Sequence, residues 1–509
     1  MSSLISDRAF ACVLVVLSAC STTTVDRTDC TDADQCVAAF GEGHRCGDRG
    51  FCVPGGCTST DECRAAEGFG SVCLDGSCQA ATPHPRCVET YRADIYARLG
   101  DFPLVSGDLM DRSLATHQAR ERSAQLAYRK ANDEGGLDGE VGLILCTIEE
   151  NVDFDGLSRR EAAVAAAEWL ADEIGVPAIV GPAASGDTQA VFEAVRDRDV
   201  IVVSPSATSP ALTALDETSP TDAMPGRLWR TAPPDSFQGA TLAADVAARA
   251  VTRVAVVVES GAYGEGLFEV FGDAFRADGG TIVGTPFLFD SGNESQRDEQ
   301  IINAGATDAV EVLFISSQTT DAVAMLQIAN STSGFDTKSI LLTDSAGTSE
   351  VAMAAPAALR GRIRGTRPAP IAGPVFDVFR GAYAAANMGQ SPDEFTFTAQ
   401  AYDAAWLTLM GAAHAFETEG TIGGELVAQG IRRLNAGAST NLVPSNWAGA
   451  KAAFRRGDTI DVVGASGPLD YDLATEEIEA AIEVWGILEC MAENAIRTTA
   501  DPGGTLTCD

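Results

Sequence analysis

Short apolar runs alternate with amphipathic stretches along most of the chain from about residue 87 onward. Near-continuous apolar runs lie at Glu140–Leu145, Pro177–Gly181 and Asp199–Pro205, and stretches with helical periodicity occupy 159–174 and 188–196. Strands that are apolar on both faces and separated by amphipathic helices are typical of parallel sheets covered by helices. The pattern therefore predicts a doubly wound α/β sheet in this part of the chain.

The same alternation resumes after Arg230. We expect helices at 237–250, 267–278, 297–305 and 319–328. We expect strands at Arg253–Glu259, Thr281–Val283, Glu311–Ile315 and Ile340–Thr343. Helical stretches then dominate 375–456, and two apolar runs close the chain at 460–463 and 480–487. A second doubly wound parallel sheet is therefore predicted, and the body belongs to the α/β class.

The N-terminus carries an apolar stretch that predicts an export signal. Ala9–Ala19 follows Arg8 and is shorter than the ~20 apolar residues that a membrane-spanning helix needs. It ends in Leu17-Ser18-Ala19-Cys20, which resembles a bacterial lipoprotein box. That resemblance implies that 1–19 is removed and that Cys20 becomes the acylated first residue, which anchors the protein by lipid. The alternative is an ordinary signal peptide with a chance cysteine.

A cysteine-rich tandem repeat occupies most of 20–86. The spacing Cys30-x5-Cys36-x9-Cys46-x5-Cys52 is followed by Cys57-x5-Cys63-x9-Cys73-x4-Cys78. Each copy has few large apolar residues and needs covalent staples to fold. Because exported cysteines are usually oxidised, we predict two disulfides per copy, with a zinc site as the alternative. Gln79–Arg86 is predicted to be a linker.

The composition makes the chain acidic. It has 72 Asp and Glu against 35 Lys and Arg, a formal net charge of −37, and 45% hydrophobic residues. The negative charge repels nucleic acids, and the apolar content is sufficient for large cores. The body has only His117 and His414 as histidines, and it contains no nucleophile elbow, His-Glu-x-x-His pair or phosphate-binding Gly-x4-Gly-Lys loop. We expect no catalytic residue, metal, cofactor or nucleic-acid partner, and therefore no enzyme.

Three loops at predicted strand ends are candidates for binding. The loops Gly181–Thr188 and Val203–Pro210 are rich in serine and threonine. Hydroxyls and free N–H groups at helix N-termini bind carboxylates without a basic side chain. The alternative is helix capping, for which Asp187 and Ser209 are suited. In the second sheet, a glycine-rich loop follows a strand and surrounds Tyr263, so that the ring is presented to a cleft.

Five segments carry a family resemblance. They read AIVGPAASGDTQ, VIVVSPSATSPALT, LWRTAPPDSFQGATLA, VAVVVESGAYGEGLFEVF and AVEVLFISSQTTDAVAML. In this order and spacing, the chain from about Val88 to Leu488 resembles the type I periplasmic binding proteins. It is most similar to the branched-chain amino-acid receptors that serve ABC importers. The resemblance implies two lobes, joined by three crossing strands, that close on a ligand between them.

The resemblance also implies lobe boundaries. The first lobe is 88–231 plus 366–456, and the second is 232–365 plus 457–489. The crossings fall near Arg230, Gly365 and Asp458, and 490–509 forms a C-terminal tail.

The roles of individual residues follow from the same resemblance. Ser185 and Thr208 occupy positions that bind the carboxylate of an amino acid, and Ser206 occupies the position that offers a backbone carbonyl to the ammonium. Ala207 lies between Ser206 and Thr208 and belongs to the predicted site. Tyr263 is expected to cover the ligand from the second lobe.

Two positions depart from the pattern of the branched-chain receptors. Gln318 stands where those receptors have a second tyrosine. Ser345 stands where they have a glutamate for the ammonium, and the neighbouring Asp344 is expected to substitute if the loop is shifted by one residue. These departures put a branched-chain specificity in doubt.

The start of the body also departs from the family. The usual apolar first strand is replaced by Tyr91–Asp108, in which Phe102–Val105 is the best strand candidate. Cys146 ends the second strand, and we expect it to pair with Cys87, although Cys87 pairing with the tail is the alternative. Cys490 and Cys508 are expected to staple the tail.

The predicted function is capture of a small polar solute by an exported lipoprotein. The solute is an amino acid or a related carboxylate, and the partner is an ABC permease. The alternative is a ligand-sensing or adhesive surface lipoprotein that uses the same two-lobed body. In both cases the protein is expected on the periplasmic or outer-membrane side of the cell envelope, with membrane contact through the lipid alone.

Overall fold

The computed structural model describes most of the chain. The described residues are 29–40, 44–46, 50–54, 57, 60–67, 70–74, 77–151, 154–216, 219–369, 373–489 and 496–508. The predicted signal segment 1–19, Cys20 and Cys490 therefore lie outside the described residues. Within the described residues, no helix combines the length and the apolar character needed to cross a membrane. The chain divides into two units, of which the first is 1–82 with 172–174 and the second is the remainder.

Each copy of the cysteine repeat folds as a short helix followed by a two-stranded hairpin. The elements of the first copy are α2 (Ala33–Phe40), β1 (His44–Cys46) and β2 (Cys52–Pro54), and those of the second are α3 (Thr60–Glu67), β3 (Ser71–Leu74) and β4 (Ser77–Ala80). The first cysteine of a copy pairs with the third, and the second pairs with the fourth. The bonds are Cys30–Cys46, Cys36–Cys52, Cys57–Cys73 and Cys63–Cys78. The prediction of two disulfides per copy is confirmed, and these eight cysteines are oxidised rather than zinc-binding.

The predicted linker Gln79–Arg86 is wrong at both ends. Gln79 and Ala80 belong to β4, which pairs with β3. Arg86 is buried, and its guanidinium donates to the carboxylate of Asp155 and to the carbonyl of Glu149. The sequence pattern missed this because an arginine next to a proline, outside any apolar run, is typical of a solvent-exposed position.

The first lobe contains a doubly wound sheet. Its strand order is β10-β9-β8-β6-β7-β5, and all neighbouring strands are parallel except β5 and β7. The strands are β5 (Glu89–Tyr91), β6 (Leu104–Met110), β7 (Val141–Thr147), β8 (Ala178–Val180), β9 (Ile201–Ser204) and β10 (Leu228–Arg230). Cys87 and Cys146 are bonded, as predicted, and this bond ties the chain before β5 to the end of β7. Cys508 is disulfide-bonded.

The predicted strand Phe102–Val105 is displaced in the structure. The strand is β6, and it is fully buried along its whole length. It carries Ser106 and Asp108 in its interior, and neither Asp108 oxygen has a hydrogen-bond partner among the described residues. Burial, together with the nearby Glu121, raises the pKa of Asp108 well above its usual value. Buried polar side chains interrupt the apolar pattern, and for this reason the central strand was placed too early.

The second lobe repeats the same winding. Its sheet has the order β12-β11-β14-β15-β16-β22-β23, and β13 also pairs with β11. The strands are β11 (Arg253–Glu259), β12 (Thr281–Ile282), β13 (Phe287–Phe289), β14 (Glu311–Ile315), β15 (Ser339–Leu342), β16 (Ile363–Pro368), β22 (Ile482–Ile487) and β23 (Arg497–Thr499). The predicted strands at Arg253–Glu259 and Glu311–Ile315 are confirmed to the residue. Two doubly wound lobes of the α/β class are therefore present.

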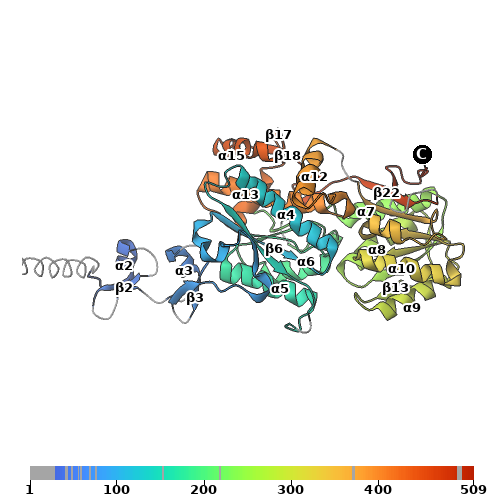
Figure 1. The fold of residues 1–509 in the computed structure, drawn as a ribbon, viewed down its shortest axis with the longest axis horizontal. Helices are drawn as coiled ribbons and strands as arrows, with labels where there is room; N and C mark the ends of the chain where they lie inside the picture. The colour runs from blue at the N-terminus through green and yellow to red at the C-terminus, as the bar shows by residue number, and fades with distance from the viewer. Residues whose placement is uncertain are drawn as a thin grey trace, which may run out of the picture. The chain divides into compact units, whose positions relative to one another are not determined.

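Helices cover both faces of each sheet (Figure 1). In the first lobe they are α4 (Ala115–Asp133), α5 (Arg159–Trp169), α6 (Ser185–Val195), α12 (Pro374–Ala386), α13 (Thr398–Glu419), α14 (Gly424–Arg432) and α15 (Trp447–Arg455). In the second lobe they are α7 (Asp235–Ala248), α8 (Ala262–Ala277), α9 (Glu294–Gly305), α10 (Thr319–Ser331) and α11 (Ser349–Ala354). A π-helical turn, Leu170–Ile174, continues α5.

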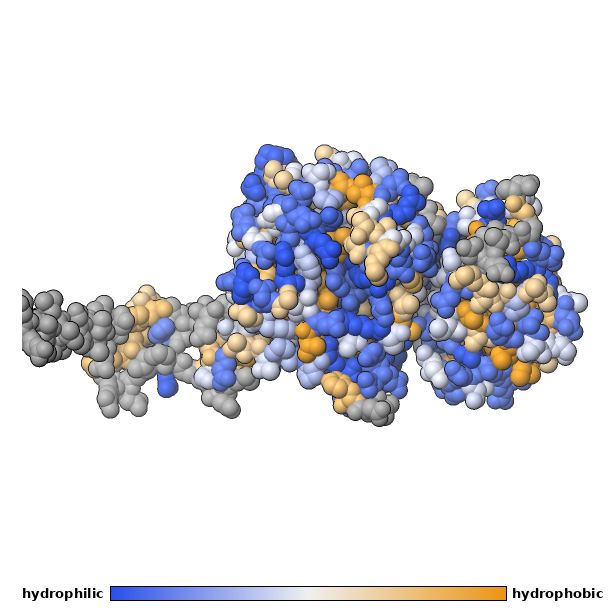
Figure 2. Space-filling model, in the orientation of Figure 1, coloured by the Kyte–Doolittle hydropathy of each residue, from blue (hydrophilic) through white to orange (hydrophobic). Residues whose placement is uncertain are grey.

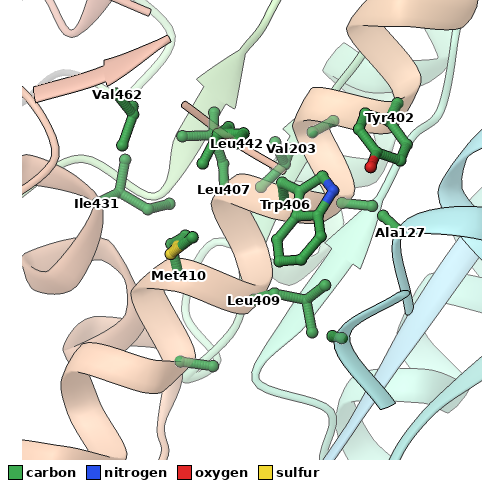
Figure 3. Close-up of a cluster of buried hydrophobic side chains, with 14 of the residues drawn as sticks. Ala127, Val203, Tyr402, Trp406, Leu407, Leu409, Met410, Ile431, Leu442 and Val462 are labelled. Carbon is green, nitrogen blue, oxygen red and sulfur yellow. The ribbon is translucent and has the colours of Figure 1, made fainter. Parts of the chain in front are cut away.

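The largest core lies under α13. Trp406 of this helix is fully buried and meets Trp447 edge to face at 5.6 Å. Figure 3 shows Trp406 among Tyr402, Leu409 and Val203, which come from the helix and the sheet beneath it. The visible surface is dominated by hydrophilic residues, in agreement with the acidic composition (Figure 2).

Two of the three connections between the lobes lie close to their predicted positions, and the third does not. The chain leaves the first sheet after Arg230, and β16, which contains Gly365, pairs antiparallel with β22. A Cβ on Gly365 would lie 2.5 Å from the Trp485 ring, so this close approach requires glycine. The third connection differs from the one predicted near Asp458, because residues 460–478 pack into the core of the first lobe.

A strand that the sequence did not predict explains this difference. β17 (Ala438–Asn441) lies within the segment expected to be helical, and it pairs with β18 (Ile460–Gly464), which in turn pairs with β19 (Gly467–Pro468). A small hairpin of β20 (Tyr471–Asp472) and β21 (Glu477–Ile478) follows. The segment after Asp458 therefore stays with the first lobe, and the third crossing comes just before β22.

The start of α5 allows a first test of local stability. Ser158 and Glu161 form a reciprocal capping box, in which each side chain accepts from the other residue's N–H. We expect Ser158→Ala to lower the free energy of unfolding by about 1 kcal/mol, because an N-terminal N–H loses its acceptor. Urea denaturation checks this. Ser331→Ala, at the exposed last turn of α10, is the control and should change stability by less than about 0.5 kcal/mol. Equal effects of the two variants would contradict the capping role.

Candidate functional site

The loops at the carboxyl ends of the two sheets meet around a cavity of about 40 Å³. Ligands of doubly wound folds bind beyond the carboxyl ends of the strands, next to the point where strand order reverses. Of the seven predicted ligand-binding residues, five line the cavity: Ser185, Ser206, Tyr263, Gln318 and Asp344. The remaining lining residues are Thr116, His117, Arg120, Ala183, Ala184, Ser317, Thr319, Ser345, Thr396 and Phe397.

The other two predicted residues, Ala207 and Thr208, are buried behind this lining. The Thr208 hydroxyl donates to the carboxylate of Asp235 at 2.9 Å, and the Thr208 N–H donates to the Ser185 hydroxyl at 3.2 Å. Thr208 therefore holds the loop together, and its hydroxyl proton is already committed to Asp235.

The two capping alternatives have different outcomes. Ser209 does act as a cap, because its hydroxyl accepts from the N–H of Ala211 at 3.3 Å. Asp187 does not cap α6; it lies inside the first turn and forms an ion pair with Arg159 at 2.7 Å. The N-cap of α6 is Ala184, which has no side-chain acceptor, so the N-terminal N–H groups of α6 lie at the cavity wall.

The second lobe contributes a hydrogen-bonded acidic cluster. The Tyr263 hydroxyl lies within hydrogen-bonding distance of the Asp344 carboxylate and, at 2.9 Å, of the Thr343 hydroxyl. The Gln238 amide also donates to Asp344, at 3.2 Å. Burial raises the pKa of Asp344, although the bonds from Tyr263 and Gln238 oppose this shift. Burial also raises the pKa of Asp235, and the charge of Asp344 adds to that shift.

The glycine-rich loop places the Tyr263 hydroxyl, rather than the whole ring that we expected, at the cavity. Gly261 has φ +116°, which side-chain-bearing residues rarely adopt, and it is the N-cap of α8. Tyr263 follows in the first turn, and its ring packs into the core of the lobe. The loop therefore fixes the ring and leaves its hydroxyl at the cavity.

One histidine and one arginine in the cavity wall, His117 and Arg120, were not predicted as site residues. His117 is buried, and its Nδ1 accepts the N–H of Asp111 at 3.3 Å. Arg120 lies one turn further along α4 and is 7% exposed. The sequence around Arg120 alternates charged and polar residues, a pattern typical of a solvent-facing helix, so no local signal marked it.

A larger cavity of about 270 Å³ adjoins the first. The two share Asp344, Thr396 and Phe397. The larger one is also lined by Phe376 and Phe395, so its wall carries aromatic rings as well as polar groups. A wall of this kind accommodates an apolar group attached to a polar one.

Comparisons with known proteins agree with this geometry. A family model described as periplasmic binding protein matches residues 113–458. A Leu/Ile/Val-binding protein from Rhizobium johnstonii is 29% identical over 38% of this chain and 52% of its own length. The chain thus spans about half of the length of the first curated relatives that it matches. BasB of Halobacterium salinarum, a substrate-binding protein of a chemotactic signal transduction system, is 26% identical over 72% of this chain and 80% of its own length.

Solved structures show the same fold. A leucine-binding protein from Thermotoga maritima has a TM-score of 0.60, with 21% identity over 78% of this chain and 97% of its own. A solute-binding protein of an ABC transporter from R. palustris, solved with benzoate, has a TM-score of 0.58, with 15% identity over 80% of this chain and 98% of its own.

The two wound lobes, with a cavity lined by loops at the strand ends of both, match the fold of the solved binding proteins. The chain belongs to the periplasmic binding protein family. The relatives are named as binding proteins, so the prediction that the chain is not an enzyme is confirmed.

Proposed function

We propose that the protein captures a small polar solute, an amino acid or a related carboxylate, and delivers it to an ABC importer. The observation that supports this most strongly is the cavity lined from both lobes, in which hydroxyls and helix N–H groups of the first lobe face Tyr263 and Asp344 of the second. A ligand that bonds to both lobes stabilises the closed state, which is the state that a partner recognises.

We further propose that the protein is exported and held in the cell envelope by a lipid on Cys20. The support is the apolar stretch Ala9–Ala19 and the lipoprotein-box sequence that ends it. Feeding cells a fatty acid with an alkyne tag tests this. The label should appear on the protein and disappear in the Cys20→Ser variant; label retained in the variant contradicts acylation at this residue.

A ligand screen tests solute capture. The Cys20→Ser chain is melted with the L-amino acids, short peptides, polyamines, nucleosides and aromatic acids. A ligand at 1,000 times its Kd should stabilise the fold by about 4 kcal/mol and raise the melting temperature by several degrees. No shift with any compound of the panel would contradict the capture of such a solute.

A sensory function is the second candidate, and the observation that favours it is the match to BasB over most of the chain. Uptake of the labelled ligand by cells separates the two functions. Deleting the gene should abolish uptake if the protein serves an importer. Unchanged uptake together with a lost response to the ligand would favour sensing.

Tyr263→Phe is expected to weaken ligand binding about tenfold. The change removes a hydroxyl that donates to Asp344, so the Asp344 carboxylate at the cavity wall is no longer held in position. A hydrogen bond to a charged group contributes about 1.5 kcal/mol or more. Calorimetric titration with the ligand found in the screen measures this. Tyr383→Phe is the matched control, because that hydroxyl is bonded to Arg122 and does not line the cavity. Equal affinities of the two variants would contradict the placement of Tyr263.

A further inference from the structure

Arg120 is held rigidly at the cavity by neutral groups. Its Nε donates to the carbonyl of Thr396 at 3.1 Å, Nη2 to the Thr396 hydroxyl at 3.0 Å, and Nη1 to the Ser206 hydroxyl at 3.1 Å. The guanidinium also lies over the Phe397 ring, 5.2 Å from its centre. The partners of this α4 side chain come from the loop after β9 and from the segment before α13, so two other parts of the first lobe fix it.

The charge of Arg120 is not balanced by a direct partner. Among the described residues, no carboxylate lies within 4.0 Å of its guanidinium, whereas Arg112, Arg159 and Arg230 of the same lobe all form ion pairs. Burial lowers the pKa of Arg120 to about 10, so the group keeps its charge at neutral pH. Burying a cation carries a large desolvation free energy unless an anion pairs with it.

The unused donors of Arg120 have the geometry of a carboxylate receptor. A guanidinium has five N–H donors, and three of them make the bonds described above. One N–H is left on Nη1 and one on Nη2. These two terminal nitrogens form the edge that binds both oxygens of a carboxylate side by side.

Asp344 supplies the opposite charge from the second lobe. It lines the same cavity, and its charge acts on Arg120 without an ion pair between them. Its carboxylate already accepts bonds from Tyr263 and Gln238, which hold it in place. The cavity therefore presents a cation from one lobe and an anion from the other.

We propose that Arg120 binds the carboxylate of an α-amino acid while Asp344 binds its ammonium, and that the side chain of the ligand enters the adjoining aromatic-lined cavity. This assignment rests on the proposed solute capture. It gives the carboxylate to Arg120 rather than to the Thr208 hydroxyl, which is committed to Asp235. A zwitterion that neutralises both charges is favoured over ligands that carry one of them.

Matched ligands test each charge separately. The wild-type chain is titrated calorimetrically with L-phenylalanine, L-phenylalaninamide, phenethylamine and 3-phenylpropionate, and with the corresponding leucine series. We expect at least one of the two amino acids to bind, and to bind about 30-fold or more tightly than its amide, amine and acid analogues, because each analogue leaves one buried charge unpaired.

Two variants assign the charges to residues. Arg120→Gln should weaken the amino acid about 30-fold or more, yet leave the amine unaffected, because the amine has no carboxylate to lose. Asp344→Asn should weaken the amino acid and leave the acid analogue unaffected. Arg122→Gln is the control, since Arg122 lies on the same helix but contacts Tyr383 and Gln390. A merely structural role would weaken all analogues alike, and thermal melts without ligand show whether each variant is folded.

The outcomes separate this inference from the proposed function. If neither amino acid binds but a polyamine, a nucleoside or another solute of the panel does, the inference is wrong and solute capture stands. If an amino acid binds and Arg120→Gln weakens its amide and amine as much as the amino acid itself, Arg120 does not receive the carboxylate. If nothing binds the wild-type chain, the proposed function fails as well.

Discussion

Arg230→Met is expected to lower the free energy of unfolding by about 3–5 kcal/mol and to weaken ligand binding. Arg230 is 2% exposed and forms an ion pair with Glu477. It also donates to the carbonyls of Ala207 at 3.2 Å and Ser209 at 2.8 Å, so it supports the loop that carries Ser206. Removing the cation leaves a carboxylate unpaired in a poorly solvated site and frees the loop. Urea denaturation and calorimetric titration measure the two effects.

Two further variants make this expectation specific. Arg276→Met removes an ion pair with Asp273 in which both side chains are largely exposed, and should cost less than about 1 kcal/mol. Arg230→Met combined with Glu477→Leu should recover much of the lost stability, because no unpaired charge is left. The double variant should still bind ligand weakly, since the loop carbonyls have lost their donor. Full recovery of affinity in the double variant would show that Arg230 does not support the loop.

Removing the Cys87–Cys146 disulfide by alanine substitution of both residues is expected to cost about 4 kcal/mol. The bond spans 59 residues, and a loop of this length restricts the unfolded chain by roughly that amount. It also secures β5, a three-residue strand at the edge of the sheet that pairs with β7. Differential scanning calorimetry should show the main transition of the body at a markedly lower temperature.

The cysteine-rich module supplies the control for this variant. Substituting Cys63 and Cys78 by alanine removes a disulfide of similar chemistry from the other unit of the chain. The main transition of the body should then stay where it is. A shift of the same size in both variants would mean that the effect comes from a general loss of disulfides rather than from the closure of this loop.

The sequence alone determined the class and the winding of the fold. β11 and β14 were predicted to the residue because a strand buried on both faces must be apolar almost without interruption. The two disulfides in each cysteine-rich copy were also predictable, since such a small module has no other source of stability. The composition of the loops at the strand ends also pointed to Ser185 and Ser206 of the first sheet and to Tyr263 of the second, because doubly wound sheets bind ligands beyond the carboxyl ends of their strands; all three line one cavity.

Tertiary structure decided what depends on contacts between distant segments. β6 carries Ser106 and Asp108 in its interior, and only its central place in the sheet makes it a strand. β17 exists because β18 pairs with it, and that pairing keeps residues 460–478 with the first lobe. Arg120 reads as a surface charge along the helix, and it becomes a buried cation because Thr396, far along the chain, folds over it. Burial and partners of this kind are properties of the assembled core, and no local pattern encodes them.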